Sequence, residues 1–218
     1  MKSSIGIVVF GDVVTSRRSA PHASRWLRSL RAELDRHYGD ARLARFDFTQ
    51  GDELQGLLAS TADPFEAIVH ASVHAEWLPM RWAISVGPVD PGRGPATQRT
   101  GAAFLQARQA LTAARTERAG LVVVTGDAAT DTLLADVAPA FKTLLDDLTD
   151  RQREIARLLL VEGLRQADVA TRLSIARPTV SVAAERARIR EIEGLAHALL
   201  TVLRSGIERI ERTAGGAP

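Results

Sequence analysis

The sequence predicts an α+β fold, a ferredoxin-like or palm-like sandwich followed by an all-α helix-turn-helix domain. Over the first 147 residues, apolar strand-like runs alternate with helical spacing in the order β-α-β-β-α-β-α-β-α, with a hairpin inside the series. From residue 148 onward the pattern is only helical, and it is rich in arginine. We therefore expect a palm-like domain at 1–147, a helical domain at 148–212 and a disordered tail at 213–218.

Each element of the palm-like part follows from a local pattern. Residues 5–10 form a β-branched run typical of a buried strand, and residues 21–38 place Trp26 and Leu30 on one helical face. The other expected elements are a hairpin of strands at 42–49 and 53–59, strands at 80–87 and 120–125, and helices at 63–77, 102–115 and 128–147. We expect the helices to cover one face of a mostly antiparallel sheet and to leave the other face open.

Composition excludes several classes of protein. The 218 residues suit one large domain, or a medium domain with a small one. The sequence contains no uninterrupted run of about 18 apolar residues, so we expect no membrane span. The first strand begins so early that we also expect no signal peptide. The chain has no cysteine. That excludes disulfides, cysteine zinc sites and thiol nucleophiles, and it fits a cytoplasmic protein.

Basic charge is concentrated in the C-terminal third of the chain. The formal net charge of the whole chain is only +2, yet residues 151–190 hold nine arginines against four acids. Such an asymmetry indicates that this part meets a polyanion. The alternative is an ordinary solvated helix surface in an arginine-rich protein.

Two acidic positions stand where neighbouring strands end. The first strand ends at Gly11-Asp12, and the hairpin turn carries Gly51-Asp52-Glu53. If the two strands lie side by side, Asp12 and Asp52 come close, and two close carboxylates repel each other unless a cation lies between them. We therefore predict that Asp12, Asp52 and Glu53 bind Mg²⁺ or Mn²⁺. The alternative is that these acids are ordinary turn residues.

Two further groups of polar residues have candidate roles. The turn after the first strand offers hydroxyl groups, arginines and free amides that could hold phosphates, or hydroxyl groups that simply cap a helix. Its residues are Thr15, Ser16, Arg17 and Arg18. His70 and His74 are four residues apart on an expected helix. They would make a metal pair or, more commonly, a helix surface, and no third ligand is evident.

The helical domain has the features of a helix-turn-helix. Thr149 and Gln152 form a capping box, Ala170 is small where two helices must approach, and Pro178 starts the second helix. These choices serve a tight crossing of two short helices, with the second one exposed to the DNA major groove. A bundle used for protein contacts is the alternative.

Four segments of the helical domain form a recognisable series: Leu148-Thr149 with Arg151 to Ile155, Glu162-Gly163-Leu164, Val169-Ala170 with Leu173, and Pro178 to Ser181. With these segments, residues 148–188 resemble the DNA-binding domain of LuxR-type regulators and region 4 of sigma factors. One departure is Ser174, where many such proteins place glycine in the turn. The resemblance implies that the residues facing the groove are Arg177, Thr179, Ser181, Val182, Glu185 and Arg186.

Four landmarks lie within the palm-like part: Phe10 to Val14 with Ser16-Arg17, Phe48 to Leu57, Arg81 to Pro88, and Thr100 to Phe104 with Ala107-Arg108. By these landmarks, most of residues 5–125 is similar to the SatD family of small bacterial proteins. The segment also resembles the palm fold of class III nucleotidyl cyclases and GGDEF domains. This resemblance implies that Asp12 and Asp52 bind two metals on a nucleoside triphosphate, with Glu53 adjacent as in the GGDEF pattern.

The palm resemblance has two departures. Phe48 stands where such cyclases usually place the lysine that reads the base, and Phe104 stands where they place an asparagine. Arg108 would still contact phosphate. The two acids therefore support metal–nucleotide binding better than cyclisation.

Taken together, these features predict a regulator that binds double-stranded DNA and whose palm-like domain binds a purine nucleotide with its metal. The alternatives are a metal-dependent nucleotidyltransferase or cyclase with a regulatory helix-turn-helix, and a degenerate palm that acts only as a dimerisation scaffold. We expect a homodimer. The apolar spacing over 192–212 fits a dimer seam, or a helix that folds back on its own chain.

Overall fold

The computed structural model describes residues 4–14, 20–49, 52–117 and 120–215. The element order matches the predicted one. The N-terminal elements are β1 (Ser4–Val13), α1 (Ala20–Tyr38), the 3₁₀ turn η2 (Gly39–Ala41), β2 (Arg42–Phe48), β3 (Glu53–Ala59), α2 (Phe65–Ser72), β4 (Met80–Val89), the 3₁₀ turn η3 (Ala96–Gln98), α3 (Ala102–Ala114), β5 (Leu121–Val124) and α4 (Ala128–Asp146). The C-terminal elements are α5 (Asp150–Ala156), the π-helical turn η4 (Arg157–Val161), α6 (Gln166–Arg172), α7 (Arg177–Arg186) and α8 (Ile189–Gly215).

The five strands form one sheet in the order β2-β3-β1-β4-β5. The predicted hairpin is β2–β3, and every pairing is antiparallel except β4–β5, which is parallel. The register places Asp12 of β1 opposite Glu53 of β3 on one side and opposite Arg81 of β4 on the other. The α+β architecture and the mostly antiparallel sheet are thus as predicted.

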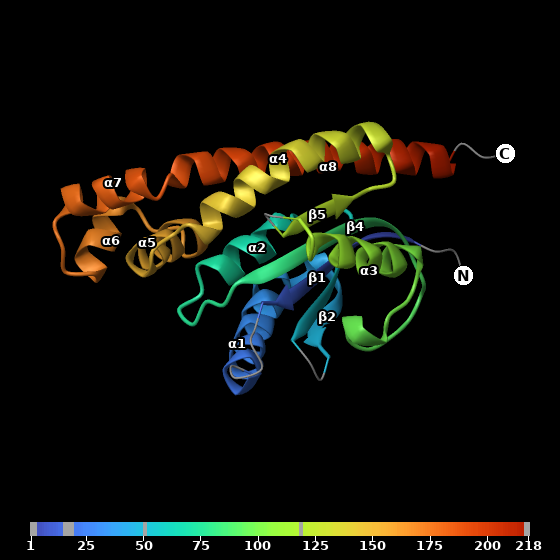
Figure 1. Ribbon diagram of the computed structural model, residues 1–218, viewed down its shortest axis with the longest axis horizontal. Helices are drawn as coiled ribbons and strands as arrows, with labels where there is room; N and C mark the ends of the chain where they lie inside the picture. Colours follow the sequence, from blue (N-terminus) through green and yellow to red (C-terminus); the bar gives the residue numbers. More distant parts are fainter. Residues whose placement is uncertain (1–3, 15–19, 50–51, 118–119, 216–218) are drawn as a thin grey trace.

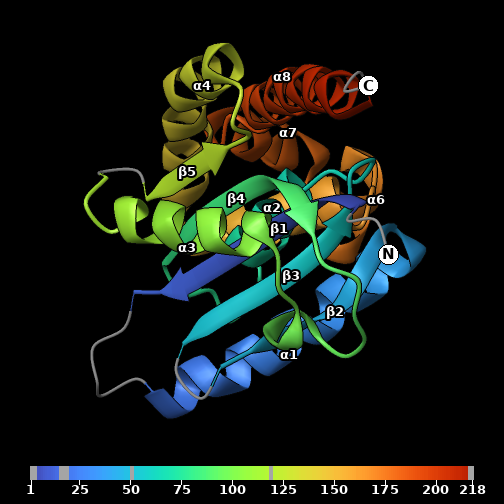
Figure 2. The same ribbon diagram turned by 90° about the vertical axis from the view of Figure 1, so that its right-hand side faces the viewer.

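Helices cover both faces of the sheet, so the expectation of one open face is wrong. Helix α3 lies across one face, and α1, α2, α4 and α8 lie on the other side (Figure 2). The reason lies in β1, where Val8 and Phe10 point to the α3 side while Ile7 and Val9 point to the opposite core. A strand that is apolar on both faces needs a cover on each.

The long helix α8 folds back over its own chain. It runs from the α5–α7 end of the molecule alongside α4 (Figure 1). Leu199, Leu203 and Ile207 of α8 are buried in the same core as Phe141 of α4. Of the two possibilities left open for this apolar stripe, the structure has the intramolecular one. The helix continues to Gly215, past the start of the predicted tail.

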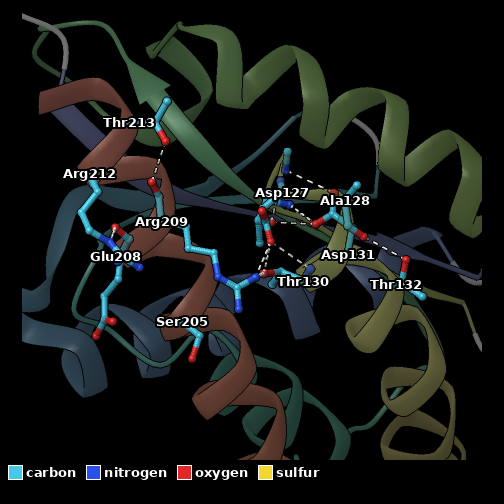
Figure 3. A network of polar contacts seen from close by, with 12 residues as sticks. Asp127, Ala128, Thr130, Asp131, Thr132, Ser205, Glu208, Arg209, Arg212 and Thr213 are labelled. Atoms are coloured by element: carbon cyan, nitrogen blue, oxygen red, sulfur yellow. Dashed lines mark hydrogen bonds and ion pairs between the residues drawn. The ribbon is translucent and has the colours of Figure 1, made fainter. Parts of the chain in front are cut away.

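A polar network joins α8 to the start of α4 (Figure 3). Arg209 donates to the Asp127 carboxylate at 2.7 Å and to the Thr130 hydroxyl at 3.2 Å. Asp127 is also the N-cap of α4, where its side chain accepts from the Thr130 amide. Next to this contact Gly206 faces Thr130 so closely that a Cβ on the glycine would lie 2.7 Å from the Thr130 methyl carbon. The two helices therefore meet at a position that requires glycine.

The helical part has the local features that its sequence predicts. The Thr149–Gln152 capping box is present in both directions. Ser174, in the turn between α6 and α7, has a positive φ of 53°, which is the left-handed conformation that glycine adopts without cost. A small core beneath the turn consists of Ile155, Leu158, Val169, Ala170 and Val180. Among the described helices, none is long and apolar enough to cross a membrane.

Candidate functional site

The predicted acids lie at one end of the sheet, under α3. The β1–β3 register puts Asp12 and Glu53 side by side on the face that α3 covers. Only 7% of Asp12 and 8% of Glu53 is exposed, so both carboxylates are buried at the rim of the sheet. The amide of Val13 donates to the Asp52 carbonyl at 3.0 Å, which ties the hairpin turn to β1.

Each buried acid is paired with an arginine of the α3 segment. Arg108 Nη1 lies 2.8 and 2.7 Å from the two Glu53 oxygens. Arg115 Nε lies 3.3 Å from Asp12 Oδ2, and Arg81 of β4 lies 3.9 Å from the same oxygen. We call these five residues the acid–arginine cluster. The guanidinium group of Arg108 also stacks over the Phe10 ring, 5.0 Å from its centre, so the ring holds this arginine over the sheet.

Burial dominates the electrostatics of Asp12. Its pKa is raised above the ordinary value because burial disfavours the charged carboxylate, and the ion pair with Arg115 only partly offsets this. The charge of Asp52 adds to the rise, so these two carboxylates are near enough to interact. A cation close to Asp12, whether arginine or metal, would favour its ionised form.

The cluster fits a metal only after rearrangement. Within the described residues, no three His, Cys, Asp or Glu side chains form a group that could hold a metal ion. Asp12 and Glu53 are adjacent, but their oxygens face arginines. Metal binding by Asp12, Asp52 and Glu53 would require those arginines to turn away, so it stays a prediction. The predicted phosphate contacts Thr15, Ser16, Arg17 and Arg18 lie outside the described residues.

Two members of the cluster were not predicted. Arg108 was expected to contact phosphate and lies in the cluster, but Arg81 and Arg115 were not identified. Arg115 follows Arg108 by seven residues, which is two helical turns and puts both on one side of α3. That spacing was a usable signal. The approach of Arg115 to Asp12 spans 103 residues of sequence, and no local pattern reports it.

His70 lies on α2, but His74 lies beyond it, so the expectation of one helix over 63–77 that carries both histidines is wrong. The helix ends at Ser72, and the two histidines have different partners. The His70 Nδ1 atom lies 2.7 Å from Glu33 Oε1, while the His74 Nε2 atom lies 3.1 Å from the Ser29 hydroxyl. Their different partners explain why they form no metal pair in the part of the chain that the structure describes. Both rings are buried, and both contact side chains of α1.

Helix α7 exposes the side chains predicted to face DNA. Val180 and Ala184 are buried on its inner side. The exposed residues on the outer side are Arg177, Thr179, Ser181, Val182, Glu185 and Arg186. Val182 is 46% exposed. A groove runs between α7 and the start of α5, and Thr149, Arg151, Thr179, Val182 and Arg186 line part of it.

Comparisons with known proteins assign no family. No protein-family model and no curated protein matches the chain. The structure is similar to that of a bacterial light-regulated adenylyl cyclase, with 14% identity over 56% of this chain and 77% of that chain and a TM-score of 0.43. A second structure of such a cyclase has 15% identity over 56% of this chain and 43% of its own, with a TM-score of 0.39.

The third similar structure is a Regulator of Polyketide Synthase Expression from Bifidobacterium adolescentis. It has 17% identity over 96% of this chain and 82% of its own, with a TM-score of 0.31. Similarity at these values assigns no activity. The SatD-type and LuxR-type resemblances therefore stay predictions.

Proposed function

We propose that this chain is a DNA-binding transcriptional regulator in which α7 enters the major groove. The observation that carries the proposal is the geometry of α6, Ser174 and α7. The left-handed turn at Ser174 redirects the chain, and the buried Val180 and Ala184 hold α7 by its inner side. This leaves a polar outer surface with an arginine at each end of the helix, which is the arrangement that a recognition helix needs.

The outer residues have chemistry suited to base edges and phosphates. Arg177 and Arg186 can donate two hydrogen bonds to guanine, and Thr179 and Ser181 can contact phosphate or base. Exposed apolar groups on such a helix suit the thymine methyl group, which gives Val182 a role. In a homodimer, two copies of α7 would read two half-sites whose spacing the dimer geometry sets.

Salt-dependent DNA binding tests this proposal. The probe is a fluorescent pool of random-sequence DNA duplexes. The duplexes that the protein binds most tightly are then selected from this pool. We expect affinity to fall steeply between low and high salt, because arginine contacts to phosphate release counterions. Arg177→Ala and Arg186→Ala should each weaken binding to a selected duplex about 5- to 100-fold, which corresponds to one lost base contact.

Arg93→Ala is the matched control, because Arg93 is an exposed arginine in the loop between β4 and η3. It should bind like the wild type. If Arg177→Ala and Arg186→Ala both bind selected DNA as tightly as Arg93→Ala does, α7 is not the recognition helix.

We further propose that the palm-like part binds a purine nucleotide at the acid–arginine cluster. The observation behind this is the convergence of buried carboxylates and three arginines at one rim of the sheet. Asp12, Asp52 and Glu53 would hold Mg²⁺ or Mn²⁺, and the bound cation would neutralise phosphate charge. Arg108, with the segment from Thr15 to Arg18, would then contact the phosphates.

Calorimetric titration with ATP and GTP, first with Mg²⁺ and then with EDTA, separates three functions. Metal-dependent binding that Asp12→Ala abolishes and Asp136→Ala retains supports the nucleotide sensor; Asp136 is an exposed acid of α4. Turnover of a labelled triphosphate that Asp52→Ala abolishes would instead make the chain a nucleotidyltransferase or cyclase. No heat with either nucleotide, in a protein that still binds DNA, leaves the palm as a dimerisation scaffold.

A further inference from the structure

Two arginines connect the helical part to the palm-like part. Arg153 and Arg157 lie four residues apart on the continuous helix made by α5 and η4, so they project from the same side of it. Arg153 is only 4% exposed and donates to the backbone carbonyls of Ser72, Leu145 and Asp146. Its guanidinium group also lies 3.5 Å from the centre of the Trp77 ring. This contact is a fixed anchor, because its acceptors are backbone groups.

Arg157 makes a different kind of contact. Its two terminal nitrogens lie 3.1 and 3.0 Å from the two oxygens of Glu33 on α1. Glu33 also binds the His70 Nδ1 atom of α2 at 2.7 Å, so one carboxylate joins three elements. The Arg157 side chain is 28% exposed, whereas Glu33 is 12% exposed. The pair therefore lies at the edge of the interface, where it can separate without opening the core.

The Glu33 contact belongs to a chain of ion-pair and ring contacts that runs from α2 to α6. The chain contains Glu66, His37, His70, Glu33, Arg157, Glu162 and Arg172. The rings of His37 and His70 are 4.3 Å apart, and Arg172 of α6 lies 3.4 Å from Glu162. Burial lowers the pKa of His74, which contacts Ser29, although His74 lies close enough to Glu33 for the charge of that carboxylate to raise its pKa by a smaller amount. The palm helices and the first helix of the helix-turn-helix are thus connected through this chain of contacts.

Arg157 is also the first residue of a π-helical turn. The Glu162 amide donates to the Arg157 carbonyl at 3.1 Å, which is the five-residue spacing of a π turn. Such turns are rare, and they are often found at functional positions. Conversion to an α turn would move the following residues by one position, a rotation of about 100° around the helix axis. Helix α6, which follows the turn, would then face the palm in a different direction.

We propose that the Glu33–Arg157 pair is an interdomain latch that holds the π turn and fixes the helix-turn-helix against the palm. When the pair separates, the π turn relaxes and α6 and α7 change position, while Arg153 keeps the two parts attached. A change in α1, caused by a ligand of the palm, would reach α7 by this route. The coupling to DNA rests on the proposed function, but the latch itself does not.

The charge state of Glu33 is stable enough for this role. Burial alone would raise its pKa, but hydrogen bonds from His70 and Arg157 lower the pKa to about 2. Glu33 therefore stays ionised at physiological pH. The latch opens through movement of α1 or of the π turn, and neutralisation of the carboxylate is not needed.

Spin-label distances in the full chain test the latch directly. The chain has no cysteine, so Thr171→Cys on α6 and Gln109→Cys on α3 provide two unique labels at exposed positions. We expect a narrow distance distribution in the otherwise wild-type protein. Glu33→Gln and Arg157→Ala should each broaden or shift it, and the double variant should change it no further than either single variant.

The control is Arg31→Ala, which removes an ion pair that α1 makes within the palm, to Asp47. Its distance distribution should stay narrow. Arg157→Lys keeps the charge but loses the two-point contact, and it should give an intermediate distribution. Distributions for Glu33→Gln and Arg157→Ala that match the control would overturn the proposal.

Hydrogen exchange gives a second readout that needs no label. The Glu162 amide should exchange faster in Glu33→Gln than in Arg31→Ala, because the bond that closes the π turn weakens. Equal exchange rates would contradict the latch. DNA affinity is measured on the same proteins. If distances change but neither the wild type nor the variants bind DNA, the latch stands and the DNA-binding proposal fails.

Discussion

Single residues carry measurable strain, and Ser174 is the clearest case. Its φ of 53° is a conformation that costs a residue with a side chain about 1 kcal/mol. Ser174→Gly should therefore raise the free energy of unfolding by about 0.5 kcal/mol, after the entropy that glycine adds to the unfolded chain. Urea denaturation measures this. Ser181→Gly, the same change inside α7, should lower the free energy by up to about 1 kcal/mol. A loss of stability in both variants would contradict the conclusion that the backbone of Ser174 is strained.

Asp63 predicts a pH dependence. Burial raises its pKa to about 6, although the side chain also accepts a hydrogen bond from the Phe65 amide at the start of α2. The folded chain then binds a proton more tightly than the unfolded chain, in which the pKa of Asp63 is near its ordinary value of 3.8. Stability from this group is therefore present at low pH and is lost as pH rises through about 6.

Asp63→Asn keeps an acceptor for the hydrogen bond from the Phe65 amide and removes the charge. We expect it to raise the free energy of unfolding by about 1–2 kcal/mol at pH 7.5, and to change it little at pH 4. Thermal melts at both pH values measure the difference. Asp136→Asn, at an exposed position, should change neither melt. A gain in Asp63→Asn that is equal at the two pH values would refute the assignment.

At the scale of elements, sequence patterns predicted the features that depend on residues close together in the chain. The capping box at Thr149, the β2–β3 hairpin and the turn at Ser174 all depend on residues a few positions apart. The cover of α3 over the acids and the return of α8 onto α4 depend on packing between distant segments. The contact between Arg157 and Glu33 joins residues that are 124 positions apart. The candidate metal ligands were therefore predicted from their strands, but their pairing with Arg81, Arg108 and Arg115 was not.

The α4–α8 crossing gives a prediction at this scale. Gly206→Ala would put a Cβ 2.7 Å from the Thr130 methyl carbon, and hydrogen bonds to Asp127 hold Thr130 in place. We expect a loss of about 1–3 kcal/mol in unfolding free energy, because overpacking outweighs the better helix propensity of alanine. Gly194→Ala on the same helix has nothing within 4 Å. It should stabilise the protein by up to about 1 kcal/mol. If both variants were stabilised, the α4–α8 crossing would have enough space for a Cβ at position 206.

At the scale of the whole molecule, the predicted boundary after residue 147 divides the sequence more sharply than it divides the packing. One core cluster contains Ile7 of the sheet, Leu134 and Phe141 of α4, and Leu199 and Leu203 of α8. A helix that begins beside α7 thus completes the palm-like part. Movements of α7 and the state of the palm are then mechanically related, both through α8 and through the Arg153 anchor.

This shared core predicts that residues 1–147 are unstable alone. Without α8, the buried side of α4 would face water, and each large apolar side chain so exposed costs about 1.5–3 kcal/mol. We expect the fragment to melt more than about 10 °C below the full chain and to bind a hydrophobic dye. Leu199→Ala in the full chain, which leaves a cavity in the same core, should cost about 2–5 kcal/mol. A fragment that melts cooperatively at the temperature of the full chain would show instead that the palm is an independent domain and that α8 merely rests on it.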